Sequence, residues 1–308
     1  MEREAAIFVA GAGTFLGDAL LGALHTRGFE RLVGDADEPD LRDAASVDAF
    51  FAHEAPRYVF LAAGRSGGIA ANQHEPADLM LDNLLVQTHV LRAAHRTGVR
   101  KLVYLASACI YPRECEQPMR PEQIGSGPLE PTSEAYAMAK LGGLVLCRAY
   151  ARQHGARFVS AIPANPFGPG DDFDPERAHV VGALVRRMVE ARRRRDPEVV
   201  VWGSGRARRD FLYADDLADA CILLMERYEG EAPINVSAGV DLSIGELAER
   251  IKKAAGFEGR LVFDPSRPDG APRKLLDAGS LRALGFRPRT SLDEALAATV
   301  RGFEASLR

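Results

Sequence analysis

The chain has 308 residues with a formal net charge of −4; 46% of its residues are hydrophobic and 27% are charged. This length suffices for one large α/β domain or two unequal lobes, and the mildly acidic balance gives no reason to expect nucleic acid or an anionic membrane as a partner. No apolar run approaches the ~20 residues of a membrane span, and the first residues do not resemble a signal peptide. The four cysteines form no Cys-x-x-Cys pair and no metal-ligand spacing with histidine. We therefore expect a cytoplasmic protein without a metal site.

A glycine-rich turn between a strand and a helix is the first candidate functional segment. A short buried strand at residues 5–10, the sequence Gly-Ala-Gly-Thr-Phe-Leu-Gly and an apolar-periodic helix from about residue 18 follow one another, an order typical of dinucleotide binding. Gly11 allows a tight turn, Gly13 lets the backbone approach a pyrophosphate, and Gly17 lets the helix pack on the strand. An ordinary strand–helix loop is the alternative. The candidate cofactor contacts in the turn are Gly11, Gly13, Thr14, Phe15, Leu16 and Gly17.

Acidic residues after the turn bear on the choice of cofactor. The second predicted strand ends in Asp35, about 18 residues after Gly17. A carboxylate there accepts hydrogen bonds from the adenosine ribose and repels a 2′-phosphate, and the adjacent positions hold no arginine to offset that repulsion. We therefore predict that NAD(H) is favoured over NADP(H). Asp37 and Glu38 are neighbouring alternatives for the acidic role.

Strands and helices alternate in the first half of the chain. We predict strands at 58–64, 101–106 and 158–162, helices at 46–53, 76–97 and 136–154, and loops at 65–73 and 113–134. Ser46 is the predicted N-cap of the first of these helices. The alternation predicts an α/β fold with a doubly wound parallel sheet of the Rossmann kind. The pattern then changes, so we place a dinucleotide-binding domain at 1–165 and a smaller, partly interleaved substrate lobe at 166–308.

Three residues form a candidate catalytic group. Tyr136 and Lys140 stand four apart in a predicted helix, on one face and one turn from each other. The ammonium lowers the cost of ionising the phenol, so Tyr136 can exchange a proton with a developing alkoxide near neutral pH. Ser107, at the end of an apolar run, can give a second hydrogen bond to the same oxygen. Hydride transfer between a nicotinamide and a carbonyl carbon requires such a group. The Tyr-x-x-x-Lys spacing alone is weaker evidence, because it also arises where a tyrosine packs against the core and a lysine faces the solvent.

With the glycine turn, Ser107, Tyr136 and Lys140 all present, the chain resembles the extended short-chain dehydrogenase/reductase family. Longer segments narrow this resemblance to the GDP-L-fucose synthases, the GDP-4-keto-6-deoxymannose 3,5-epimerases/4-reductases. The similar segments cover nearly the whole chain and lie at 61–63, 67–69, 107–112, 129–132, 199–205 and 274–277.

The resemblance implies an enzyme that epimerises C3 and C5 of a GDP-4-keto-6-deoxy sugar and reduces C4 with NAD(P)H, giving GDP-L-fucose or a close relative. It assigns hydride transfer to Ser107, Tyr136 and Lys140, and the acid and base of epimerisation to Cys109 and His179. This chemistry is reasonable because a C4 ketone acidifies the hydrogens on its neighbouring carbons, and a thiol and an imidazole titrate near the working pH. The resemblance also implies a homodimer formed through the helices at 76–97 and 136–154.

The resemblance further implies the ligand contacts. Cofactor contacts beyond the turn are Asp35, Asp40, Leu41, Ala62, Ala63, Gly64, Tyr136, Lys140, Pro163 and His179. Substrate contacts are Ser107, Asn165, Arg187, Trp202 and Arg209. Arginine forks suit a diphosphate, and an indole offers an apolar face. Three alternatives stay open: a related GDP-keto sugar such as a heptose or dideoxy sugar, epimerisation at one centre only, and a non-catalytic dinucleotide-binding sensor on the same fold.

Overall fold

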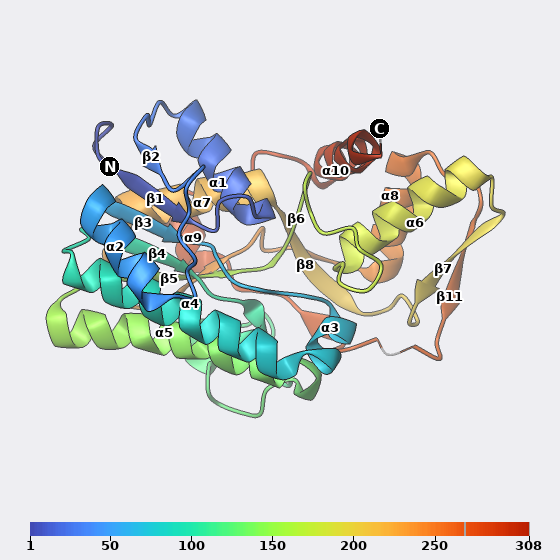
Figure 1. The fold of residues 1–308 in the computed structure, drawn as a ribbon. Helices are drawn as coiled ribbons and strands as arrows, with labels where there is room; N and C mark the ends of the chain where they lie inside the picture. Colours follow the sequence, from blue (N-terminus) through green and yellow to red (C-terminus); the bar gives the residue numbers. More distant parts are fainter. Residues whose placement is uncertain (268, 308) are drawn as a thin grey trace.

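A six-stranded parallel sheet forms the centre of the first lobe. The computed structural model describes residues 1–267 and 269–307 (Figure 1). The strands of this sheet lie in the order β2-β1-β3-β4-β5-β9. Their bounds are β1 (Ile7–Ala10), β2 (Leu32–Val33), β3 (Tyr58–Leu61), β4 (Lys101–Leu105), β5 (Phe158–Pro163) and β9 (Ile234–Val236). The order reverses between β1 and β3, and in open parallel sheets ligands bind outside the carboxyl ends of the strands at such a point.

Helices cover both faces of this sheet (Figure 1). One face carries α1 (Phe15–Thr26) and α7 (Ala214–Arg227), and the other carries α2 (Ala44–Glu54), α4 (Pro76–Arg96) and α5 (Glu134–His154). The strands β1, β3, β4 and β5 are buried along their whole length. Because both faces are covered, these strands are continuous apolar runs instead of alternating patterns. The predicted doubly wound α/β sheet is confirmed.

A second lobe follows the fifth strand. Its strands are β6 (Asn165–Phe167), β7 (Glu198–Trp202), β8 (Arg208–Tyr213), β10 (Asp241–Ser243), β11 (Arg260–Asp264) and β12 (Arg273–Lys274). Its longer helices are α6 (Val180–Arg194), α8 (Ile244–Ala255) and α10 (Leu292–Ser306). The lobe has its own hydrophobic core, centred on Val185, Met188 and Leu247. Between these elements the chain returns to the large sheet through α7 and β9.

Short elements connect the long ones. They are α3 (Ile69–His74), α9 (Gly279–Ala283) and three single 3₁₀ turns, Ala108–Ile110, Pro121–Gln123 and Pro131–Ser133. None of the helices within residues 1–267 and 269–307 is both long enough and apolar enough to cross a membrane.

Three local predictions were wrong. The second strand ends at Val33, so Asp35 lies in a bend beyond it and is exposed. The helix α2 begins at Ala44 because the Asp43 side chain, and not Ser46, provides the cap: it accepts a hydrogen bond of 2.8 Å from the Ser46 amide. The segment expected to be a loop at 65–73 contains most of α3, which is too short to show a helical period in the sequence.

Candidate active site

The glycine turn has the close packing that its sequence predicts. A Cβ at Gly17 would lie 1.9 Å from the carbonyl oxygen of Gly11, and a Cβ at Gly11 would lie 2.7 Å from the amide nitrogen of Ala63. Over Gly13, whose φ is +74°, no atom of a described residue other than Gly13 and its two chain neighbours lies within 4 Å of the Cβ position. Thr14 caps α1, accepting from the Gly17 amide at 3.2 Å and donating to Gly11 O at 2.6 Å. The turn therefore packs on the end of β3 and leaves open space at a helix N-terminus, which fits a pyrophosphate.

A cleft of about 710 Å³ opens beside this turn, within the size range of small-molecule sites. One wall comes from the first lobe and the other from the loop that precedes α6 and from the end of β7. Of the predicted contacts, its lining includes Thr14, Phe15, Leu16, Ala62, Gly64, His179 and Trp202. Residues from both halves of the sequence thus face one cleft at the point where the strand order reverses.

Ser107, Cys109 and Tyr136 lie together at the carboxyl end of β4. Ser107 follows the strand, and its hydroxyl oxygen accepts a hydrogen bond of 3.2 Å from the Cys109 amide. Burial raises the pKa of Tyr136 above its usual range, the nearby Cys109 raises this pKa further, and a hydrogen bond with Ser107 lowers it. Burial has the largest effect, so the pKa of Tyr136 lies above its usual value in the protein. Tyr136 is therefore protonated at neutral pH, the form that can donate a proton.

Lys140 lies one turn further along α5 and is buried. Burial lowers its pKa to about 8, because desolvation disfavours the ammonium. Its Nζ lies 5.0 Å from the centre of the Tyr104 ring. The ammonium is thus present below pH 8 and is lost as the pH rises through that value.

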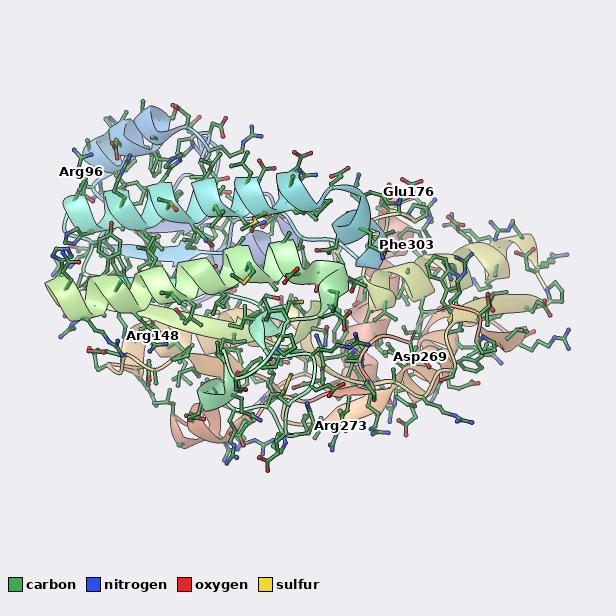
Figure 2. The ribbon with its side chains drawn as sticks, turned by 90° about the horizontal axis from the view of Figure 1, so that it is seen from below. Arg96, Arg148, Glu176, Asp269, Arg273 and Phe303 are labelled. Atoms are coloured by element: carbon green, nitrogen blue, oxygen red, sulfur yellow. The ribbon has the colours of Figure 1, made fainter. Side chains whose placement is uncertain are left out.

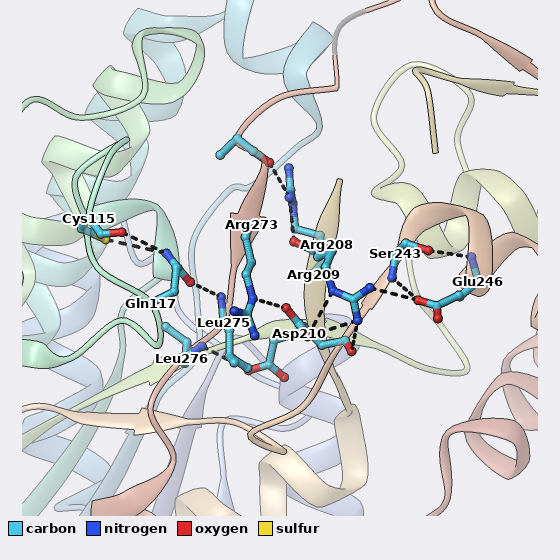
Figure 3. A network of polar contacts seen from close by, with 12 residues as sticks. Cys115, Gln117, Arg208, Arg209, Asp210, Ser243, Glu246, Arg273, Leu275 and Leu276 are labelled. Atoms are coloured by element: carbon cyan, nitrogen blue, oxygen red, sulfur yellow. Dashed lines mark hydrogen bonds and ion pairs between the residues drawn. The ribbon is translucent and has the colours of Figure 1, made fainter. Parts of the chain in front are cut away.

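Arg209 reaches the same region from the second lobe. Burial lowers the pKa of Arg209, and the charges of Asp269, Cys109 and Glu130 raise it. Backbone carbonyls fix the guanidinium: Nη1 donates to Ala271 O at 2.6 Å and to Arg208 O at 2.8 Å (Figure 3). A fixed, buried guanidinium suits an anionic ligand group.

Trp202 lies at the end of β7 with half of its surface exposed. The guanidinium carbon of Arg187, on α6, lies 4.8 Å from the indole centre, and that of Arg267 lies 5.0 Å from it. An exposed indole beside two cations can hold a flat base next to a diphosphate. Arg267 was missed in the sequence. The pairing of Asp264 with Trp202 in the β11–β7 register brings it here, and that pairing is not readable from spacing.

His179 immediately precedes α6 and lines the cleft, where its side chain is accessible to solvent. The protein atoms around it nevertheless displace enough water to lower the pKa of the imidazole, and the charge of Asp172 acts in the opposite direction. His179 is therefore neutral at pH 7 and can accept a proton.

The predicted acidic contacts are arranged differently from the expectation. Asp35 is exposed, and Asp40 forms an ion pair of 3.1 Å with Arg42. It is Glu38 that reaches the glycine turn, where its carboxylate accepts a hydrogen bond from the Gly11 amide. Burial raises the pKa of Glu38, while the Gly11 and Ala12 amides lower it.

The remaining predicted contacts lie around the ends of the strands. Leu41 and Ala63 are buried in the core, and Pro163 is the buried last residue of β5. Asn165 begins β6, and its side-chain amide donates to Asp210 O at 2.7 Å. Asp210 is itself buried and accepts from the Ser237 hydroxyl. It also accepts from the Leu276 amide at 3.4 Å (Figure 3).

Comparisons with known proteins agree with this geometry. The NAD dependent epimerase/dehydratase family matches residues 7–239. A putative GDP-L-fucose synthase 2 of Arabidopsis thaliana is 47% identical over 300 residues, which are 97% of this chain and 92% of that protein. A GDP-L-fucose synthetase of Naegleria fowleri bound to NADP superposes with a TM-score of 0.92 at 31% identity, over 100% of this chain and 95% of that one. A GDP-6-OMe-4-keto-L-xylo-heptose reductase of C. jejuni has a TM-score of 0.92 at 29% identity, over 99% of each chain. The chain therefore belongs to the NAD dependent epimerase/dehydratase family and, within it, to the GDP-L-fucose synthases.

Proposed function

We propose that the protein epimerises a GDP-4-keto-6-deoxy sugar at C3 and C5 and reduces it at C4 with NAD(P)H, giving GDP-L-fucose or a close relative. The observation that carries this proposal is the meeting of Ser107, Cys109 and Tyr136 at the carboxyl end of β4. A reductase alone would need no thiol at this place, and an epimerase alone would need no net transfer of a proton to the C4 oxygen.

In the reduction, Tyr136 gives its phenolic proton to the C4 oxygen as the carbonyl carbon becomes tetrahedral. When bound, a nicotinamide would supply the hydride to that carbon. Ser107 donates a hydrogen bond to the same oxygen and so stabilises the negative charge that develops there. Lys140, charged below pH 8, stabilises the phenolate that Tyr136 becomes.

In the epimerisation, the C4 ketone acidifies the hydrogens on C3 and C5. A base removes one of them, the electron pair moves into an enolate whose charge lies on the C4 oxygen, and an acid returns a proton to the opposite face of the carbon. His179, neutral at pH 7, is the base of this pair and the Cys109 thiol is the acid. Each inversion consumes no net proton, and hydrogen bonds from Tyr136 and Ser107 stabilise the enolate.

The test is to incubate the purified protein with GDP-4-keto-6-deoxymannose and NADH or NADPH in D₂O. We expect one cofactor oxidised per sugar, with deuterium at C3 and C5 of the product. Cofactor oxidation without deuterium at either carbon would show that the protein is a reductase and not an epimerase, like the reductase named in the C. jejuni structure. No oxidation with either cofactor would refute the proposal.

We also propose that NADH is the preferred cofactor and that Glu38, in place of Asp35, faces the adenosine ribose. Two features support this: the Glu38 carboxylate lies on the Gly11 amide, and positions 13, 34 and 36 hold no arginine. A carboxylate that faces a 2′-phosphate costs on the order of 1–4 kcal/mol in a partly wet site. The Naegleria fowleri relative binds NADP, so the preference is proposed for this chain and not for the family.

We expect kcat/KM to be about ten-fold or more higher with NADH than with NADPH. Glu38→Gln removes the charge but keeps an oxygen for the Gly11 amide, so it should narrow this ratio to about three-fold or less. The matched control Asp35→Asn removes an exposed charge and should leave the ratio unchanged. Equal use of both cofactors by the wild type would refute the preference. If Asp35→Asn narrowed the NADH/NADPH ratio and Glu38→Gln did not, Asp35 would be the residue that faces the ribose.

We further propose a homodimer formed through α4 and α5. These helices lie side by side on the surface of the first lobe (Figure 2), and they expose Leu81, Met138 and Val145 by 54%, 45% and 52%. Apolar side chains gathered on two neighbouring helices indicate a protein interface.

Leu81→Arg combined with Val145→Arg should convert the dimer into a monomer, because each subunit of a two-fold interface would then bury two additional charges. Light scattering after size-exclusion chromatography measures the mass directly. Val240→Arg, at an exposed apolar position in the second lobe, is the control and should remain dimeric. A monomeric wild type would contradict this proposal.

A further inference from the structure

Behind Lys140, the elements α4, β4 and α5 meet around two buried polar side chains. Gln87 on α4 is 3% exposed and Tyr104 on β4 is fully buried. Gln87 Nε2 donates to the carbonyl oxygen of Ala139 at 2.6 Å. The Tyr104 hydroxyl lies 2.8 Å from Gln87 Oε1 and 3.1 Å from the carbonyl oxygen of Lys140, so its single proton is shared between these two acceptors. Two successive carbonyls of α5 are thereby tied to α4 and β4 at the turn that carries Lys140.

The Tyr104 ring also contacts the Lys140 side chain. Lys140 Nζ lies over the ring, 5.0 Å from its centre, where the negative face of an aromatic system attracts an ammonium. The next turn of α5 makes room for this arrangement. A Cβ at Gly143 would lie 2.5 Å from the Tyr104 hydroxyl and 2.6 Å from Gln87 Oε1, so a larger residue would displace both side chains.

From this geometry we propose that Tyr104 is a positioning residue for Lys140: its hydroxyl, with Gln87, fixes the turn of α5 that carries the lysine, and its ring holds the ammonium. Tyr104 is also the fourth residue of β4, and Ser107 follows that strand three residues later. One side chain therefore sets the distance between the two elements that carry the redox group. The inference rests on the proposed reductase function.

The groups around the Lys140 ammonium determine in which direction the pKa of Lys140 should move when Tyr104 is replaced. The titratable groups on the neighbouring elements are Tyr104 on β4 and Tyr136 and Cys147 on α5. From α4 come the neutral side chains of Asn83 and Gln87. Burial raises the pKa of Tyr104 well above its usual value, so its hydroxyl remains a donor throughout the range in which Lys140 titrates. Loss of the ring should make the ammonium less stable and move its titration to lower pH.

Two variants separate the hydroxyl from the ring. Tyr104→Phe removes only the hydroxyl and should lower kcat for the C4 reduction about three- to ten-fold, with KM for the sugar unchanged. Gln87→Leu should reproduce this loss. Tyr104→Leu also removes the ring, so Lys140 should titrate about 0.5–1 pH unit lower, and the alkaline limb of the kcat–pH profile should move with it.

The Lys140 titration can be followed without turnover. The chain has only five lysines, so ¹³Cε-lysine labelling gives few signals, assigned by substitution: Lys101, Lys140, Lys252, Lys253 and Lys274. Tyr58→Phe is the control, because Tyr58 is a buried tyrosine of β3 whose hydroxyl donates to Glu2. It should retain wild-type kcat and Lys140 titration.

Three results would overturn the inference: wild-type kcat in a folded Tyr104→Phe, an unchanged Lys140 titration in Tyr104→Leu, or an equal loss of kcat in Tyr58→Phe. If Tyr104→Leu does not fold, Tyr104→Phe and Gln87→Leu still decide through kcat. If the wild type does not reduce the keto sugar, the proposed function fails by itself, and the ¹³C titration still decides the role of Tyr104.

Discussion

Tyr136→Phe is expected to lower the rate of C4 reduction by about 10²–10⁴, the usual contribution of a positioned acid. The substitution removes the proton that the C4 oxygen must receive, and it keeps the ring that fills the site. Binding of NADH should change little, because the lost hydroxyl acts on the sugar oxygen. The measurement is single-turnover oxidation of NADH in the presence of the keto sugar, with NADH binding followed by fluorescence.

Tyr150→Phe provides a matched control, since Tyr150 belongs to the same helix and packs between aromatic rings away from the cleft. It should retain the wild-type rate. Reduction at the wild-type rate by Tyr136→Phe would remove this residue from the mechanism.

The same mechanism predicts a pH dependence. The pKa of Tyr136 is raised by burial, so the phenol is protonated at all working pH values and does not limit the rate. Burial lowers the pKa of Lys140 to about 8, so the ammonium is present below that pH and is lost above it. The kcat of reduction should therefore be high at pH 7 and fall as the pH rises through about 8, and Lys140→Met should abolish this limb.

Several features of the fold could be predicted from sequence because they depend on local patterns. Buried parallel strands are continuous apolar runs, and a glycine turn between a strand and a helix has few other uses. The meeting of Ser107 with Tyr136 was expected from the chemistry of hydride transfer and from the family resemblance, and the hydrogen bond that affects the Tyr136 pKa agrees with it. Their roles, like those of Cys109 and His179, stay predictions until variants are assayed.

Other features depend on contacts that sequence spacing does not encode. The short second strand moves Asp35 into a bend and lets Glu38 reach the Gly11 amide, although both residues are acids in one loop. Arg267 reaches Trp202 only through strand pairing. In the sequence, Tyr104 is simply one residue of an apolar strand. The partners of its hydroxyl come from α4 and α5, so they become apparent only when these helices are packed against the strand.

Cys109→Ser should lower the rate of epimerisation by about 10²–10⁴ while leaving hydride transfer less affected. The thiol acts on carbon-bound hydrogens, whereas Tyr136 and Ser107 act on the C4 oxygen. A serine hydroxyl keeps the size and the polar character of the side chain, but it is a far weaker acid than a thiol. Deuterium uptake at C3 and C5 from D₂O measures epimerisation separately from cofactor oxidation.

The partner of Cys109 can be tested in the same assay. His179→Asn removes the base and should also suppress deuterium uptake, and the balance between C3 and C5 should differ from that of Cys109→Ser because the two groups act on opposite faces of the sugar. Cys115→Ser is the matched control, since Cys115 is an equally half-buried free cysteine in the loop between β4 and α5. Normal uptake in Cys109→Ser would make Cys109 a packing residue, and normal uptake at both carbons in His179→Asn would require a different base in the cleft.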